Sequence, residues 1–78
     1  MTVTAYVLIQ TEVGRAEKVA SSARAIKGVV AADNVAGPYD VIVKTEADTL
    51  DELGQLVVSA IQQVEGITRT FTCPIVNL

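Results

Sequence analysis

Histidine is absent from this 78-residue sequence, and cysteine occurs only once, as Cys73. A lone cysteine cannot form an intramolecular disulfide, and a structural zinc site is not expected without histidine. Catalysis that depends on an imidazole is excluded for the same reason. Aromatic residues make up only 4% of the chain, too few for the stacking surfaces with which some sheets bind RNA. We therefore expect no metal, no cofactor and no histidine-dependent chemistry.

Positive charge and long apolar runs are also scarce. Six Lys and Arg against nine Asp and Glu give a formal charge of -3. Binding to nucleic-acid phosphates requires clustered positive charge, so direct binding to nucleic acid is not expected. The N-terminal apolar run at 5–9 is too short for the apolar region of a signal peptide or for a membrane span. We expect a cytoplasmic protein without a membrane segment.

Hydrophobic residues, mainly Val, Ala, Ile and Leu, make up 50% of the chain, as in a packed core. The length allows a single domain, 1–78. A domain of this size buries only about 60% of the surface that its unfolded chain exposes. With no disulfide or metal to add stability, self-association is the expected way to bury more surface. We therefore expect a homo-oligomer.

Hydrophobic periodicity predicts four strands and two helices. A glycine marks the end of each predicted helix, because glycine adopts a left-handed cap conformation at little cost. The second helix begins with a capping box, in which Thr49 and Glu52 each satisfy a free backbone N–H. The predicted elements are a strand at 3–11, a helix that ends near Lys27, a hairpin of strands at 29–36 and 41–46, a helix closed by Gly66, and a strand at 67–76.

The two halves of the chain resemble each other. The segment AIKGV at 25–29 recurs in form as QVEGI at 63–67, a period of 38 residues (66 minus 28). Each half is one strand–helix–strand unit, and the order β-α-β-β-α-β is that of the α+β ferredoxin-like fold. Right-handed crossovers then predict a four-stranded antiparallel sheet of order 4-1-3-2 with both helices on one face.

The face of the sheet away from the helices is expected to be apolar. Tyr6 and Leu8 in the first strand and Ile42 in the third would all lie there. An uncovered apolar face usually marks an interface, and sheet-to-sheet dimerisation is the simplest way to cover it. The alternative is a solvated face with scattered apolar side chains, which is common in monomers.

The turn Gly37-Pro38-Tyr39-Asp40 lies at the tip of the predicted hairpin. Glycine and proline suit a tight turn, so turn geometry alone can account for them. Tyr39 and Asp40 add polar groups next to free backbone N–H groups, which can hold a carboxylate, while Asp40 can pair with an ammonium. These features favour a zwitterionic amino acid as ligand. The alternative is a tight turn that binds nothing.

Candidate catalytic groups are few. Cys73 has no histidine partner and is treated as a small apolar strand residue. Asp48, Asp51 and Glu52 cluster at a helix start, where they complement the helix dipole, so this role is favoured over a metal site. We therefore do not expect an enzyme.

Four segments in order, AYVLI (5–9), AIKGV (25–29), AGPYDV (36–41) and ITRTFTCP (67–74), resemble the ligand-binding domain of the Lrp/AsnC family of transcriptional regulators, called regulation of amino-acid metabolism or RAM. The resemblance covers 3–76. It implies a non-enzymatic amino-acid sensor whose sheet-joined dimers assemble into octameric or decameric rings. It also implies effector binding between dimers near the hairpin, at Gly37, Tyr39 and Asp40. Thr70 and Thr72 in the last strand are added because they lie near the hairpin in this fold.

Full-length members of that family carry an N-terminal helix-turn-helix domain, whereas this sequence starts at the first strand. The resemblance is therefore to the stand-alone RAM domain, with no helix-turn-helix and no direct DNA binding. Such a module would modulate transcription by associating with full-length Lrp/AsnC regulators. Two alternatives remain open: a cofactor-free dimeric α+β barrel enzyme, which shares the fold, and a purely structural oligomerisation module.

Overall fold

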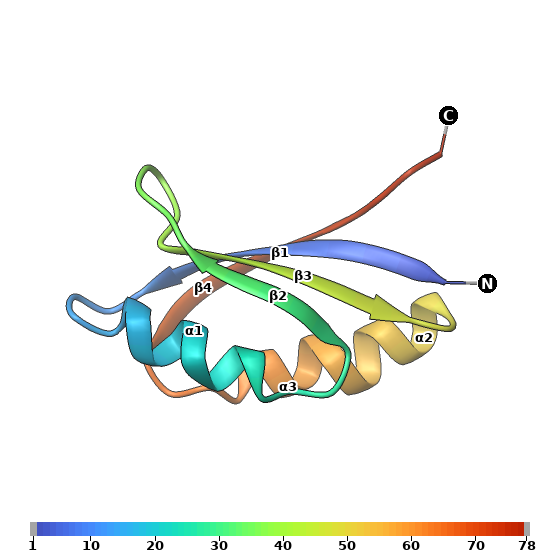
Figure 1. Cartoon of the computed structure of the whole chain (residues 1–78), viewed down its shortest axis with the longest axis horizontal. Coiled ribbons are helices and arrows are strands. Elements are labelled where there is room, and N and C mark those ends of the chain that lie inside the picture. Colours follow the sequence, from blue (N-terminus) through green and yellow to red (C-terminus); the bar gives the residue numbers. More distant parts are fainter. Residues whose placement is uncertain (1, 78) are drawn as a thin grey trace.

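Four antiparallel strands form one sheet with helices packed on a single face, in a computed structural model that describes residues 2–77 apart from the side chain of Leu56 (Figure 1). The strand order β2-β3-β1-β4 is the predicted order 4-1-3-2 counted from the other edge. The ferredoxin-like α+β fold is thus confirmed. The elements are β1 (Val3–Thr11), α1 (Ala16–Arg24), β2 (Val29–Asn34), β3 (Val41–Ala47), α2 (Leu50–Glu52), the π-helical η1 (Leu53–Val58), α3 (Ser59–Gln62) and β4 (Ile67–Pro74).

The second helix of the layer is made of α2, η1 and α3, which follow one another without a break. It begins at the predicted capping box, of which the structure gives the Thr49 half: the Glu52 N–H donates to Thr49 Oγ1 at 3.1 Å. At η1 the spacing between hydrogen-bond donor and acceptor lengthens from four residues to five, since the Ser59 N–H donates to the Gly54 carbonyl. In the part of the chain that the structure describes, no helix is long and apolar enough to cross a membrane.

The first helix, α1, ends three residues before the predicted end near Lys27. The Ala25 N–H donates to the Ser22 carbonyl at 3.2 Å, the three-residue spacing of a tighter turn. Gly28 closes this turn with a φ of +99°, in the left-handed region. Apolar periodicity extends past the true end because Ile26 packs against the core although it lies in the turn.

The 38-residue repeat is also a symmetry of packing. Val19 in α1 and Val57 in η1 are equivalent positions of the two halves. A Cβ on Gly28 would lie 2.5 Å from Val57 Cγ2, and a Cβ on Gly66 would lie 3.3 Å from Val19 Cγ2. Each turn glycine therefore packs against the helix of the other half. A side chain at Gly28 would force Val57 to move, whereas one at Gly66 would require a smaller shift.

The core lies between the sheet and the helix layer. Alternate residues of β1 point into it, and Ala5, Val7 and Ile9 are fully buried. The buried polar residue Thr45 is satisfied, because its hydroxyl donates to the Ala5 carbonyl at 2.9 Å. The other buried apolar residues are Val19, Ala20 and Ala23 in α1, Ala32 in β2, Val41 and Val43 in β3, and Leu53, Val57 and Ile61 in the second helix.

Three strand ends differ from the prediction. β2 ends at Asn34 and β4 at Pro74, each two residues early, while β3 extends one residue further, to Ala47. After β2 the Val35 N–H donates to the Asp40 carbonyl at 3.0 Å, which closes the base of the hairpin. Hydrogen bonding between β4 and β1 reaches one residue beyond Pro74, because the Ile75 N–H donates to the Thr4 carbonyl at 2.9 Å. Closure of the hairpin base, rather than apolarity, thus sets the end of β2.

Candidate functional site

An apolar row crosses the face of the sheet opposite the helices, which the described residues leave open (Figure 1). Leu8 pairs directly with Ile42 of β3 and with Phe71 of β4, and directly paired residues point to the same face. Tyr6 lies on this face two residues along β1. Tyr6 is 39% and Phe71 43% exposed, while the two aliphatic residues are half-buried. We call Tyr6, Leu8, Ile42 and Phe71 the open-face patch.

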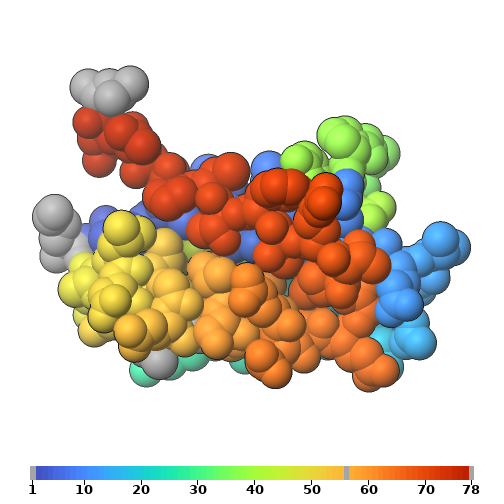
Figure 2. Space-filling model, turned by 180° about the vertical axis from the view of Figure 1, so that it is seen from behind, coloured from blue at the N-terminus to red at the C-terminus, as the bar shows by residue number. Residues whose placement is uncertain are grey.

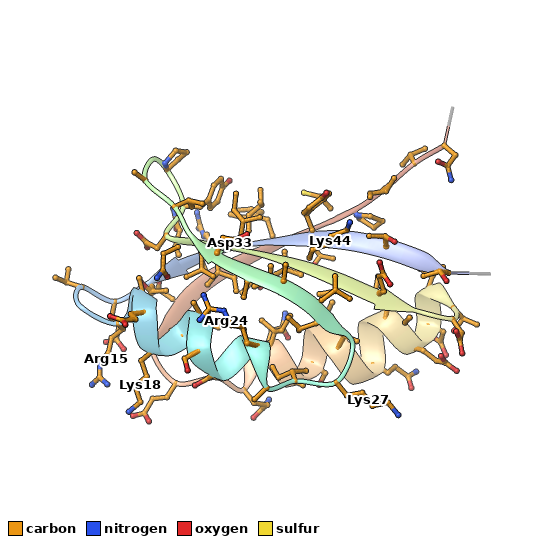
Figure 3. The ribbon with its side chains drawn as sticks, in the orientation of Figure 1. Arg15, Lys18, Arg24, Lys27, Asp33 and Lys44 are labelled. Carbon is orange, nitrogen blue, oxygen red and sulfur yellow. The ribbon has the colours of Figure 1, made fainter. Side chains whose placement is uncertain are left out.

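Charged residues of both signs surround the open-face patch. Figure 3 shows Asp33 and Lys44 on the side of the sheet away from the helices, whereas Arg15 and Lys18 lie on the helix side. The strand pairing explains this placement, because Asp33 pairs with Ile42, Lys44 with Tyr6, Glu46 with Thr4 and Arg69 with Gln10. These four charged residues, two acidic and two basic, balance one another around an apolar centre.

The hairpin tip (residues 35–40) joins β2 to β3 and rises from the end of the sheet on the open side (Figure 1). The Asp40 N–H donates to the Ile9 carbonyl at 2.9 Å, one residue out of the register in which Ile9 pairs with Val41, and so ties the tip to β1. Gly37 has a φ of +131°, in the region of backbone conformation that favours glycine. No described atom lies within 4 Å of a Cβ built on Gly37, so a side chain there would strain the backbone without a clash.

Two contacts from the end of β1 hold the hairpin tip. Asp40 Oδ2 accepts the backbone N–H of Thr11 at 2.8 Å and the Thr11 hydroxyl at 3.3 Å. Gln10 Nε2 donates to the Pro38 carbonyl at 3.0 Å. A carboxylate offers about four lone-pair sites, so the Thr11 bonds do not exhaust the capacity of Asp40. Asp40 is therefore part of the scaffold of the tip as well as a candidate ligand group.

The ring of Tyr39 leans from the hairpin tip onto the open face. Its centroid lies 5.9 Å from that of Phe71, with the two rings at 75°, an edge-to-face arrangement. The guanidinium carbon of Arg69 lies 5.6 Å from the centroid of the same Phe71 ring. The space-filling view from behind shows the tip rising beside β4 (Figure 2). The candidate site and the open-face patch are thus in contact.

Thr70 and Thr72 lie on the other face of β4. They pair with Ile9 and Val7, whose side chains are buried beneath the sheet on the helix side. Thr70 is half-buried and Thr72 is exposed. Within one chain the structure therefore does not bring these hydroxyls together with Tyr39, which lies on the opposite side of the sheet.

Sequence reasoning missed four residues around the tip: Gln10, Thr11, Arg69 and Phe71. Strand alternation was a usable signal for Phe71, because it places this residue on the face opposite its two threonine neighbours. No group of three or more Cys, Asp or Glu residues in the described part of the chain is arranged to hold a metal ion. What the tip offers chemically is a carboxylate, exposed turn backbone and an aromatic ring.

The fold and the site at the hairpin tip first define the class of protein. The element order, the strand order and a helix layer on one face make the chain a ferredoxin-like α+β domain with a candidate site at its hairpin. The family follows from comparison, because residues 4–77 match the family model of the Lrp/AsnC ligand binding domain. The chain belongs to this family.

Similar proteins include whole regulators and small domains. The HTH-type transcriptional regulator PF0250 of Pyrococcus furiosus is 33% identical over 72 residues, 88% of this chain and 48% of that protein. The chain thus spans about half the length of the curated relatives it matches. The crystal structure of PHS023 from Pyrococcus horikoshii is 36% identical with a TM-score of 0.87, covering 97% of this chain and 92% of that one. TTHA0845 from Thermus thermophilus is 28% identical with a TM-score of 0.88, covering 97% and 95%.

Proposed function

We propose that this chain is a non-enzymatic, cytoplasmic module that binds a small amino acid at its hairpin tip and self-associates through its open face. It would modulate transcription by associating with full-length regulators of the Lrp/AsnC family. The observation that carries the proposal is the hairpin tip itself. The exposed turn around Gly37 and the half-buried carboxylate of Asp40, which is held by Thr11, belong to this one tip, in a domain of a ligand-binding family.

The chemistry of the tip suits a zwitterion. Backbone N–H groups of an exposed turn can donate to an α-carboxylate, and the Asp40 carboxylate can accept from an α-ammonium. The regulator NMB0573 from Neisseria meningitidis, which is 13% identical with a TM-score of 0.80 over 96% of this chain, was solved as a complex with L-Met. At this identity the match concerns the fold, and it makes L-methionine a reasonable first probe.

The open face supports self-association with a second copy. Its apolar centre, the open-face patch, is bordered by two acidic residues, Asp33 and Glu46, and two basic residues, Lys44 and Arg69. A surface that carries both signs can meet its own copy with opposite charges facing each other, as an isologous dimer requires. The small core of a chain of this length also favours the additional burial.

Larger assemblies belong to the same proposal. Thr70 and Thr72 lie on the helix side of β4, opposite the hairpin tip of their own chain. They could therefore reach a ligand at a hairpin tip only if that tip belonged to another copy. Effector binding between dimers, within octameric or decameric rings, would meet this condition. Association with a full-length regulator would use the same kinds of contact, through the open face or between dimers.

The two alternatives make different demands on the structure. A barrel enzyme would need reactive or polar groups between the helices and the sheet, and the buried polar residue described there, Thr45, already donates to the Ala5 carbonyl. This observation favours the binding module over the enzyme. A purely structural module has the same fold and differs only in lacking a ligand.

A thermal screen tests the proposal. The unfolding midpoint of the chain is measured with each common amino acid, L-methionine included, because a ligand that binds only the folded state must raise the midpoint. We expect at least one amino acid to do so. Native mass spectrometry of the same mixtures should show that ligand bound to a dimer or a larger assembly. A midpoint that none of the amino acids raises would favour the structural module.

A further inference from the structure

Phe71 has two neighbours that connect separate parts of the molecule. On one side it belongs to the open-face patch, directly paired with Leu8. On the other side its ring receives the edge-to-face contact of Tyr39 from the hairpin tip, at 5.9 Å between centroids. The guanidinium of Arg69, 5.6 Å from the ring centroid, adds a third partner. A single half-exposed ring therefore joins the proposed interface to the candidate ligand site.

We propose that Phe71 is a positioning residue for the hairpin tip, and that a second copy seated on the open face fixes the tip through it. In one chain alone, Phe71 is 43% exposed and its partner Tyr39 is half-buried, so water competes for the faces of both rings. A second copy would cover Phe71 and restrict its rotation. The Tyr39 contact would then hold the tip more firmly.

The coupling runs in both directions by thermodynamic necessity. If self-association favours the ordered tip, then anything that orders the tip, including an amino acid bound there, favours self-association by the same factor. The inference rests on the proposed function, because it needs both the dimer and the site at the tip. Beyond that function, it names Phe71 as the residue through which self-association affects the ligand site.

Three backbone amides report the state of the tip without any ligand. The N–H groups of Val35 and Asp40 donate to the carbonyls of Asp40 and Ile9, at 3.0 and 2.9 Å. The Thr11 N–H donates to the Asp40 carboxylate at 2.8 Å. These bonds break when the tip opens, so hydrogen exchange at the three amides measures how firmly it is held.

The experiment compares amide exchange in a sample diluted below micromolar concentration until sedimentation shows mostly folded monomer with exchange in a micromolar sample that is mostly dimer. In the wild type we expect protection of the three amides to rise about two- to tenfold on dimerisation, the range for an aromatic pair. Phe71→Leu keeps an apolar side chain on the open face but removes the ring, and the rise should disappear. Tyr39→Leu breaks the same contact from the exposed tip and should have the same effect, which covers the case that the first variant does not fold.

Two further variants serve as matched controls. Phe71→Tyr retains the ring and should retain the rise. Tyr6→Leu also removes a ring from the open-face patch, but at a residue paired with Lys44 and Cys73. At equal dimer fraction it should retain the rise in amide protection.

Each outcome has a distinct meaning. A rise in Phe71→Leu equal to that in the wild type overturns the inference, because the second copy would then act on the tip without this ring. A wild-type dimer with no rise overturns it as well, while the proposed self-association survives. A wild-type protein that sediments as a folded monomer at every concentration contradicts both.

Discussion

The backbone N–H of Thr11 donates a hydrogen bond of 2.8 Å to the carboxylate of Asp40, 29 positions away in the sequence. The Thr11 hydroxyl approaches the same oxygen at 3.3 Å, so Asp40 ties the hairpin tip to the end of β1. A residue proposed to bind ligand therefore also holds the site together. Its two roles can be separated by choosing substitutions that remove one and keep the other.

The first prediction concerns the scaffold role. Asp40→Ala should lower the free energy of unfolding by about 1 kcal/mol, because the half-buried Thr11 amide loses its acceptor. Asp40→Asn keeps an amide oxygen in the same place and should lower it by less than half as much. Urea denaturation of the two variants provides the measurement. Equal losses would show that the hydrogen bond to Thr11 does not stabilise the fold.

The second prediction concerns the ligand. Asp40→Asn removes the charge that would pair with an ammonium, and a charge-assisted hydrogen bond is worth about 1.5–3 kcal/mol. Affinity for the amino acid found in the thermal screen should fall roughly ten- to a hundredfold. Calorimetric titration of the wild type and Asp40→Asn measures the difference. Identical affinities would leave Asp40 with its scaffold role alone.

The third prediction concerns self-association. Leu8→Lys or Ile42→Lys should dissociate or unfold the protein, because an interface that covers the open-face patch would bury a charge without a partner. Val13→Lys is the matched control. It adds the same charge, and Val13 is fully exposed in the loop after β1. Analytical ultracentrifugation at micromolar concentration should show no folded wild-type monomer. A compact, stable wild-type monomer would contradict the proposed interface.

The fourth prediction concerns the contact between the two halves. Gly28→Ala should lower the free energy of unfolding by about 2–4 kcal/mol, because strain at positive φ adds to the clash with Val57. Gly14→Ala is the control, with a φ of +80° and no described atom within 4 Å of its Cβ. It should show the strain alone. Adding Val57→Ala should recover the part of the Gly28→Ala loss that is due to the clash, and a double variant without recovery would refute that contact as the cause.

The fifth prediction concerns DNA. The formal charge of -3 leaves little attraction for phosphates, so this chain alone should give no sequence-selective shift of duplex DNA in a mobility assay. The same assay with a full-length Lrp/AsnC regulator present should show whether the chain changes that protein's shift. A salt-dependent, selective shift by the chain alone would overturn the prediction.

Local signals made most of the fold predictable. The glycines that close both helices, Gly28 and Gly66, have φ of +99° and +100°, and they stand out in the sequence as a repeat. Strand alternation placed three of the four members of the open-face patch correctly. The π-helical spacing in η1 left no comparable signal, because one apolar stripe is compatible with hydrogen bonds to the fourth or the fifth residue before.

The candidate site was less predictable because it depends on register. The bond from Thr11 to Asp40 forms only when β1 and β3 pair in the observed alignment, with Ile9 opposite Val41. Neither residue by itself indicates the other. The contact of Tyr39 with Phe71 requires in addition that the tip bend toward the open face. Such a bend depends on the backbone of the whole turn, and Gly37 and Pro38 indicate that the turn is tight but not the direction in which it leans.

The position of β1 between β3 and β4 has a consequence for synthesis. β1 leaves the ribosome before both of its neighbours, because β3 begins about halfway along this sequence and β4 begins only at Ile67. Until then its second edge has no strand beside it, and the turn at Gly66 has not yet reached Val19 of α1. The domain can therefore reach its native fold only when nearly all of it has been translated, and a ribosome-bound intermediate would expose an open strand edge to chaperones or to neighbouring chains.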